Sequence, residues 1–377
     1  MIEMLMSLAL AFGITFYALP SIIHLSEEKR LFDFPDGRKV HKQPIPSLGG
    51  LAIFAGFITA FLLTVAFTGE YLTLQYLVAA MLVMFFVGIK DDLLNIAAFK
   101  KFLGQLLAAA ILVFKGGLVI NSMHGVLGIY ELPPMAANAF SVITIVVIIN
   151  AFNLIDGVDG LAGTLATLSI GFFTTFFAVN GDFAMACIGT SMIGALGAFL
   201  IFNFPPARIF MGDTGSLLLG LVNAALVIKF IQYSPTAPVW SISTAPAVGF
   251  AILFIPLFDT LRVFSYRILN GISPFTPDKN HLHHILLRLG LSHLPVTLSL
   301  AGANAFMIAF AIVAQPLGNH LILGAMVAMA FMVVAAMLWA YKRSVKRRVI
   351  IGNPEGANRS KTGTTVVPLT RAKAANE

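Results

Sequence analysis

Charged residues are scarce in this chain of 377 residues. Asp, Glu, Lys and Arg together make up 11% of it, whereas a soluble domain has roughly 25%. The one cysteine, Cys187, lies in an apolar run, which excludes an internal disulfide framework. There is no P-loop pattern, so we do not expect nucleotide hydrolysis as an energy source. No internal repeat and no soluble domain are recognisable.

Long apolar stretches fill most of the chain, which is 58% hydrophobic. Runs of about 18 or more apolar residues separated by short polar segments predict an all-α, polytopic integral membrane protein. The first run ends at SEEKR without a basic n-region or a cleavage pattern, so we expect an uncleaved helix. We expect eleven spans, near 4–23, 48–67, 72–89, 102–120, 137–153, 161–179, 183–203, 215–232, 245–264, 294–314 and 319–341.

The Lys and Arg residues predict the orientation of these spans. All but two of the 24, Lys115 and Lys229, fall in segments on one side of the membrane. Because cytoplasmic loops are enriched in Lys and Arg, we expect the N-terminus outside and the C-terminus in the cytoplasm. The net charge of +7 lies next to spans, which indicates contact with membrane lipids and no nucleic acid. We expect a single transmembrane catalytic domain over 1–341 and a basic, disordered tail over 342–377.

Aspartates gather at the predicted cytoplasmic ends of the spans. Asp91 and Asp92 lie in GIKDDLLN, Asp156 and Asp159 in NLIDGVDG, and Asp213 in FMGDTGS. Each pair taken alone could be an ordinary helix cap or a cytoplasmic charge. All five lie on one side, however, and ionisable groups at a membrane favour a functional site.

Their spacing and their neighbours suggest the kind of site. Asp156 and Asp159, at i and i+3, would share a face of a helical turn with Asn153. Clustered carboxylates with few cysteines suit Mg²⁺ or Mn²⁺. Thr214 and the residues after it begin a span, so a phosphate could meet free backbone N–H groups there. Asp259, in PLFDTLR, lies within about two turns of the same side.

The segment NHLHHILLRLG is unusually rich in histidine. Thr276-Pro277-Asp278 predicts the start of a short helix, with His281, His284 and Arg288 on a cationic face. The leucines opposite could lie on the membrane surface. The cationic face, together with His283, suits a phosphate or diphosphate. A zinc site and a solvated amphipathic helix are the alternatives.

Two further basic segments could hold phosphate. Lys42 belongs to a basic cluster ahead of the Pro- and Gly-rich PIPSLGG, and this cluster is either a topology signal or part of the site. Lys101, in KKFLGQ, opens the fourth predicted span close to the two adjacent aspartates. It either anchors a phosphate or only marks topology. A divalent cation among carboxylates, with cations around it, suits phosphoryl chemistry on a substrate that lies partly in lipid.

Four motifs in order complete this picture: KDD at 90–92, NLIDGVDGLAG at 153–163, FMGDTGS at 210–216 and SPFTPDKNHLHH at 273–284. Together with HKQPIPSLGG, they resemble the bacterial polyprenyl-phosphate N-acetylhexosamine-1-phosphate transferase family. The His-x-His-His form is closer to its N-acetylglucosamine-1-phosphate branch than to its phospho-N-acetylmuramoyl-pentapeptide branch.

This resemblance implies that undecaprenyl phosphate attacks the β-phosphorus of a UDP-N-acetylhexosamine at the bacterial inner membrane, on its cytoplasmic face. UMP leaves, and a lipid-linked sugar diphosphate that starts a cell-envelope glycan is formed. A homodimer is compatible with the sequence. The alternatives are the same chemistry with another UDP-sugar and a cation-coupled transporter. The transporter is disfavoured because the acids lie at one face and no repeat is visible.

The resemblance also implies roles for individual residues. Asp213, with Asn153 or Asp156, would hold Mg²⁺ or Mn²⁺. Asp91 and Asp92 would lie near the lipid phosphate, and Asp156 and Asp159 in the catalytic centre. The substrate-binding residues would be Lys42, Lys101, Arg267, His281, His283, His284 and Arg288. Two departures from the family pattern stand out: Asn95 near the KDD motif where a third acid is common, and few basic residues over 262–272.

Overall fold

The computed structural model describes residues 1–29, 31–33, 45–65, 71–271, 273 and 280–351, and it confirms an all-α architecture. In this part of the chain the strand pairing is one short antiparallel pair, β1 (Phe32–Asp33) with β2 (Ile45–Pro46). The α-helices are α1 Ile2–Glu28, α2 Gly49–Val65, α3 Tyr71–Leu94, α4 Ala98–Ala110, α5 Pro134–Ile155, α6 Leu161–Val179, α7 Phe183–Asn203, α8 Gly212–Tyr233, α9 Ala245–Ile252, α10 Phe254–Leu269, α11 Leu282–Arg288, α12 His293–Val313 and α13 Gly318–Ile351.

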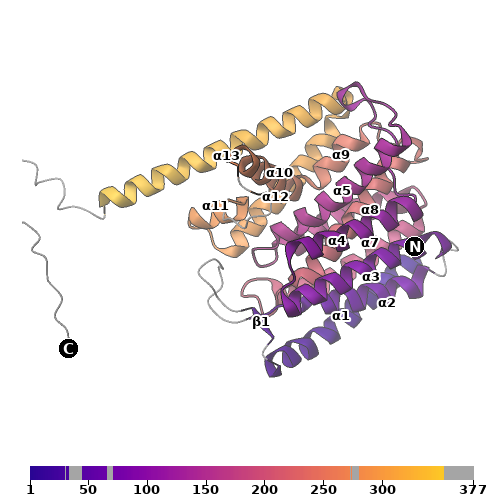
Figure 1. The fold of residues 1–377 in the computed structure, drawn as a ribbon, viewed down its shortest axis with the longest axis horizontal. Helices are drawn as coiled ribbons and strands as arrows, with labels where there is room; N and C mark the ends of the chain where they lie inside the picture. Colours follow the sequence, from indigo (N-terminus) through magenta and orange to yellow (C-terminus); the bar gives the residue numbers. More distant parts are fainter. Residues whose placement is uncertain (30, 34–44, 66–70, 272, 274–279, 352–377) are drawn as a thin grey trace, which may run out of the picture.

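The long helices form a bundle with roughly parallel or antiparallel axes (Figure 1). Within the described residues, seven helices are long and apolar enough to cross a membrane, or eight if the bent pair α9–α10 is counted. Large apolar side chains such as Phe86, Phe114 and Leu321 are more than half exposed. A soluble monomer rarely exposes so much apolar surface, so this is a multi-pass membrane protein.

Helix α8 lies at the centre of the bundle. It packs against α2, α3, α5, α6 and α9, and nearly all of its residues from Thr214 to Ile231 are buried. Because a helix that is apolar on all sides needs neighbours on all sides, the even hydrophobicity of this segment accounts for its central place. The chain thereby holds Asp213, in the first turn of α8, among the ends of the surrounding helices.

The helices depart from the expected spans in three places. The third helix continues beyond 89 to Leu94, so Asp91 and Asp92 lie within its last turns. The fourth helix begins earlier, at Ala98, and ends in a π-helical turn at Ile111–Lys115 rather than at 120. The expected boundary between domain and tail at 341 falls inside α13, which continues to Ile351.

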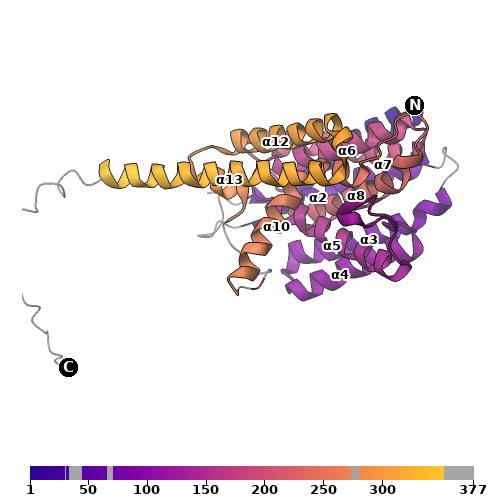
Figure 2. The same ribbon diagram turned by 90° about the horizontal axis from the view of Figure 1, so that it is seen from above.

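The ninth expected span is wrong as a continuous helix. It is broken at Leu253 into α9 and α10, which meet at 84°. Figure 2 shows α10 running across the direction of α12 and α13. A side chain of α12 satisfies the backbone at this break. Asn304 accepts from the Ile255 N–H at 2.9 Å and donates to the Ile252 carbonyl at 2.9 Å. Buried backbone groups need such partners, which explains why the break is tolerated beside α12.

Candidate active site

Four helix ends meet at the end of the bundle where β1 and α11 lie (Figure 1). Asp91 lies at the end of α3, Lys101 in the first turn of α4, Asn153 near the end of α5 and Asp213 at the start of α8. We call these four residues the acid cluster. The sequence-predicted metal and phosphate residues are thus brought together from segments more than 100 positions apart.

The ammonium group of Lys101 lies at the centre of the acid cluster. Its Nζ is 3.0 Å from Asp91 Oδ2 and 2.8 Å from Asp213 Oδ1, and it donates to Asn153 Oδ1 at 3.1 Å. The Asn153 amide in turn donates to Asp213 and, at 2.9 Å, to Ser216 Oγ. Three oxygen atoms from three helices therefore surround one cation.

Asp92 has a different environment from its neighbour Asp91. Its carboxylate accepts from the Asp213 N–H at 2.6 Å and from the Thr214 N–H at 3.0 Å, and it contacts the Thr214 hydroxyl at 2.5 Å. These contacts cap the N-terminus of α8 from another helix, where a negative charge is favourable. The backbone N–H groups that we expected to meet a phosphate are therefore occupied by Asp92.

Gly212 makes this cap sterically feasible. Its φ of +71° lies in the left-handed region, and a Cβ there would come within 2.8 Å of both Asp92 carboxylate oxygens. The segment PIPSLGG supports the same turn. The Phe210 N–H donates to the Pro46 carbonyl at 2.7 Å, and the Gly49 N–H donates to the Phe210 carbonyl at 2.9 Å. Lys42 lies outside the described residues.

The loop between α5 and α6 separates the two aspartates that we expected on one helical face. The helix ends at Ile155, Asp156 has a non-helical backbone (φ −77°, ψ 64°), and α6 begins only at Leu161. The expectation of a shared face was wrong because the glycines of this loop end the helix. Burial, together with the neighbouring charges of Asp213, Asp92 and Asp159, raises the pKa of Asp156 from its ordinary 3.8 to about 7.

Asp159 pairs with the start of α12. Its carboxylate Oδ2 lies 3.1 Å from His293 Nδ1, and its backbone carbonyl accepts from the Thr297 hydroxyl at 3.0 Å. Sequence reasoning missed His293. An ionisable side chain at the predicted edge of a span was the available signal, but its partner lies 134 residues earlier.

The histidines lie at the start of α11, which begins at Leu282 and not near Thr276 as expected. His281 therefore precedes the helix. Leu282 and Ile285 are buried against the bundle instead of lying on the membrane surface. The residues Thr276, Pro277 and Asp278 lie outside the described part of the chain.

The three imidazoles are held in different ways. His281 Nδ1 lies 3.0 Å from Asp259 Oδ2, and its ring is parallel to that of His283 at a centroid distance of 5.7 Å. His283 lies against the α5–α6 loop, where its Nε2 would be 2.6 Å from a Cβ on Gly157. Burial lowers the pKa of His283 to about 3, so it is neutral, and His284 lies beside it at 4.3 Å between ring centroids. Parallel stacked rings do not converge on one ion, which argues against the zinc alternative.

The two arginines that we expected to bind substrate lie on either side of the three histidines in the sequence. Arg267 is buried near the end of α10, with its guanidinium 5.7 Å from the centre of the Phe264 ring. Arg288 is exposed in the last turn of α11.

The donor set of the acid cluster fits a hard divalent cation. Within the described residues, no three His, Cys, Asp or Glu side chains gather closely enough to hold a metal ion by themselves. The oxygens around Lys101 are instead two carboxylates and one amide. Mg²⁺ commonly takes one or two protein carboxylates and completes its shell with water and substrate phosphate, so this set suits it.

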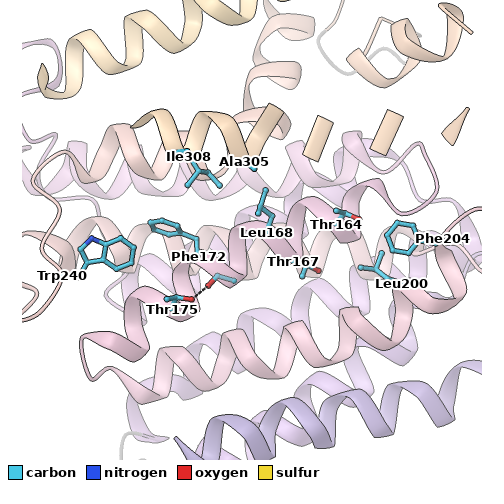
Figure 3. A pocket seen from close by; sticks show the side chains of 12 residues that line it. Thr164, Thr167, Leu168, Phe172, Thr175, Leu200, Phe204, Trp240, Ala305 and Ile308 are labelled. Atoms are coloured by element: carbon cyan, nitrogen blue, oxygen red, sulfur yellow. Dashed lines mark hydrogen bonds between the residues drawn. The ribbon is translucent and has the colours of Figure 1, made fainter. Parts of the chain in front are cut away.

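A separate apolar groove runs along α6, and its lining includes none of these acids or histidines. Its volume is about 760 Å³ and it lies between α6, the end of α7 and α12, with Trp240 at one end and Phe204 at the other (Figure 3). Phe204 also packs against Gly160, where a Cβ would come within 2.8 Å of the ring. The groove therefore ends beside the α5–α6 loop but not at the acid cluster.

The fold and the site define a multi-pass membrane protein with carboxylates, an amide and a lysine gathered at one end of the bundle, where the histidines of α11 also lie. Comparison with known proteins identifies it further. Residues 74–231 match the family model described as glycosyl transferase family 4.

Named relatives agree with this match. The probable undecaprenyl-phosphate N-acetylglucosaminyl 1-phosphate transferase of Bacillus subtilis is 34% identical over 69% of this chain and 71% of its own. The decaprenyl-phosphate N-acetylglucosaminephosphotransferase of Mycobacterium tuberculosis is 33% identical over 76% of each chain. The undecaprenyl-phosphate alpha-N-acetylglucosaminyl 1-phosphate transferase of Yersinia pestis is 29% identical over 74% of this chain and 76% of its own. The chain belongs to glycosyl transferase family 4 and is a polyprenyl-phosphate sugar-1-phosphate transferase.

Proposed function

We propose that this enzyme transfers N-acetylglucosamine 1-phosphate from UDP-N-acetylglucosamine to undecaprenyl phosphate. The products are UMP and a lipid-linked sugar diphosphate that starts a cell-envelope glycan. The arrangement of Asp91, Asn153 and Asp213 around one cation, at the end of an apolar bundle, is the main observation in support. The names of the relatives favour this sugar over the muramoyl-pentapeptide substrate and over a transporter.

We further propose eleven spans in the inner membrane, with the N-terminus outside and the active site in the cytoplasm. The thirteen described α-helices supply eleven elements for this arrangement if α9 and α10 form one broken span and the seven-residue α11 is not a span. The N-terminus and the C-terminal end of α13 lie at opposite ends of the bundle (Figure 1), as an odd number of spans requires. The acid cluster lies at the end of the bundle toward which the C-terminal part of α13 extends (Figure 1), and this part carries Lys342 and Arg343. Because Lys and Arg are enriched in cytoplasmic segments, this supports a cytoplasmic site. Residues 1–341 would form one catalytic domain.

The metal would be Mg²⁺ or Mn²⁺, held by Asp213 with Asn153 or Asp156. When bound, such a cation neutralises diphosphate charge and stabilises the charge that develops in phosphoryl transfer. The raised pKa of Asp156 fits this assignment, because a carboxylate that is costly to ionise alone gains most from a nearby cation.

In the reaction, an oxygen of the lipid phosphate forms a bond to the β-phosphorus of the UDP-sugar, and the bond from that phosphorus to the bridging oxygen breaks. UMP takes that oxygen and the electron pair. The second pKa of a phosphate monoester is about 6, so the acceptor is already largely ionised at neutral pH and an essential general base is not required. We assign contact with phosphate oxygens to Lys101, and contact with the nucleotide-sugar diphosphate to His283 and His284, which lie side by side next to the α5–α6 loop.

The decisive experiment incubates the purified enzyme in lipid with radiolabelled UDP-N-acetylglucosamine, undecaprenyl phosphate and Mg²⁺. Labelled lipid and UMP should appear in equal amounts. Other UDP-N-acetylhexosamines serve as competing donors. Folded enzyme that forms no lipid product from any of these donors would falsify the proposal.

The site assignment is tested by Asp156→Asn and Asp213→Asn. Each variant should lose at least about a hundredfold in turnover, because removal of a charged group that acts on the transition state costs several kcal/mol. Size-exclusion profiles and thermal unfolding identify variants that have lost the fold. Near-normal turnover in a folded variant would remove that residue from the metal site.

A further inference from the structure

Asp259 is a buried carboxylate outside the acid cluster, and the proposed chemistry does not use it. It lies in the second turn of α10 with 1% of its surface exposed. A buried carboxylate is costly unless several donors satisfy it. Arg262 Nη2 donates to its Oδ1 at 2.8 Å, one turn along the same helix. The remaining donors come from the histidine segment.

These donors are consecutive in the chain. His281 Nδ1 contacts Asp259 Oδ2 at 3.0 Å, and the Leu282 N–H donates to Oδ1 at 3.0 Å. The guanidinium of Arg262 also donates to the Asn280 carbonyl. Three successive residues are therefore held by one ion pair of α10, and we call 280–282 the histidine turn.

This attachment determines where α11 begins. Leu282 is the first residue of α11, and the first N–H groups of a helix have no partner within it. His281, the residue before the helix, does not cap it with its side chain. Asp259 accepts the hydrogen bond from the Leu282 N–H instead. His283 follows directly, which places its ring against Gly157 in the α5–α6 loop. Asp259 thus determines how α11 faces the loop that contains Asp156.

The same contact selects one tautomer of His281. With the proton on Nδ1 pointing at a carboxylate, Nε2 of the neutral ring has a lone pair and can only accept a hydrogen bond. A carboxylate that orients an imidazole in this way commonly affects activity without touching the substrate.

We propose that Asp259 is a positioning residue for the transfer reaction. Through His281 and the Leu282 N–H, it holds the histidine turn so that His283 and His284 meet the diphosphate of the donor. This inference rests on the proposed function for its substrate, but the attachment of the histidine turn to Asp259 does not depend on that substrate.

The test is Asp259→Asn, which preserves shape and removes charge. The asparagine can still accept from the Leu282 N–H through its oxygen, but its NH₂ group then faces His281 Nδ1. That arrangement moves the ring proton to Nε2 and weakens the pair with Arg262. Loss of such an orienting partner typically costs roughly 10–100-fold, so we expect that drop in kcat/KM for the UDP-sugar. The KM for undecaprenyl phosphate should change less than threefold.

Asp182→Asn is the matched control. Asp182 also caps a helix, accepting from the Met185 N–H at 3.0 Å, but it lies in the loop between α6 and α7. Its loss should leave kcat and both KM values unchanged. A drop in the control equal to that in Asp259→Asn would mean that loss of a negative charge at a helix start, and not the histidine turn, explains the effect.

Two further measurements separate positioning from general stability. In Asp259→Asn, amide hydrogen exchange should accelerate in peptides over 280–290 and remain unchanged in α8 peptides. In a double-mutant cycle with His281→Gln, the double variant should lose no more activity than the worse single variant, because both changes break one unit. Unchanged exchange over 280–290, or fully additive losses, would overturn the proposal. If the wild-type enzyme has no transferase activity while hydrogen exchange over 280–290 responds to Asp259→Asn as expected, the proposed function is wrong. The attachment of the histidine turn to Asp259 is then still supported.

Discussion

Lys101 is the best place to test whether the acid cluster is a cation site. Its ammonium balances two carboxylates at 2.8 and 3.0 Å, and the side chains involved are between 9% and 30% exposed. We choose Lys101→Met, which preserves the length of the side chain and removes its charge. The variant leaves Asp91 and Asp213 together without a counter-ion.

The magnitude follows from the burial of these groups. At about 3 Å, each pair is worth roughly 5 kcal/mol at an effective dielectric constant of 20, before desolvation is subtracted. Breaking a buried pair typically costs about 3–5 kcal/mol, because one charge stays behind unpaired. The variant should therefore unfold at a temperature lower by on the order of 5 °C in EDTA.

Mg²⁺ should reverse most of this loss. In the variant, the oxygens of Asp91, Asn153 and Asp213 are no longer occupied by an ammonium group, so a divalent cation can replace it. We expect 5 mM Mg²⁺ to raise the unfolding temperature of Lys101→Met at least twice as much as that of the wild type. Thermal unfolding of the purified protein in lipid nanodiscs measures both shifts, with Lys229→Met on the opposite side of the bundle as the control. An equal response of the two proteins to Mg²⁺, or no destabilisation in EDTA, would refute the reasoning.

Three more predictions concern the surrounding residues. The pKa of Asp156 is raised to about 7, so a proton competes with the metal below pH 7. The apparent Mg²⁺ affinity should therefore fall by about tenfold per pH unit between pH 6.5 and 5. Asp156→Asn should remove this pH dependence, which a metal titration followed by thermal shift measures. His293→Ala leaves the Asp159 carboxylate without its partner at 3.1 Å, so turnover should fall about tenfold or more. His293→Asn should recover part of that loss. Equal turnover in the wild type and both variants would assign the pair to stability alone. His284→Ala should raise the KM for the UDP-sugar more than that for the lipid, and an equal rise for both in steady-state assays would indicate a structural role.

The acid cluster shows how far the sequence could predict this site. Asp91, Lys101 and Asp213 were identified because each lies at the end of an apolar run, and span ends on one side of a membrane must meet at one end of a bundle. Asn153 was identified by its spacing from Asp156 and by the family resemblance. The all-α fold followed from the same apolar runs. The grouping of residues was therefore predictable from topology.

Their individual partners were not predictable in the same way. Asp92 caps α8, from a position 121 residues away in the chain, and nothing in KDD distinguishes it from Asp91. At the break after Ile252, Pro256 lacks the N–H that would bond the Ile252 carbonyl within a continuous helix, but nothing local indicates that Asn304 of another helix is the replacement partner. The start of α11 was misplaced because a local capping pattern at Thr276 was preferred over a tertiary partner, Asp259. Local signals compete with such long-range contacts and are overridden by them.

Helix α12 has a further consequence that follows from two of its contacts. Near its start, His293 and Thr297 hold Asp159, and two turns later Asn304 holds the bend from which α10 emerges. The helical rise puts Thr297 and Asn304 only about 10 Å apart along a rigid axis. A small displacement of α12 along that axis would shift the α5–α6 loop and the histidine turn together. A movement of one segment must therefore shift or bend the same helix that holds the other.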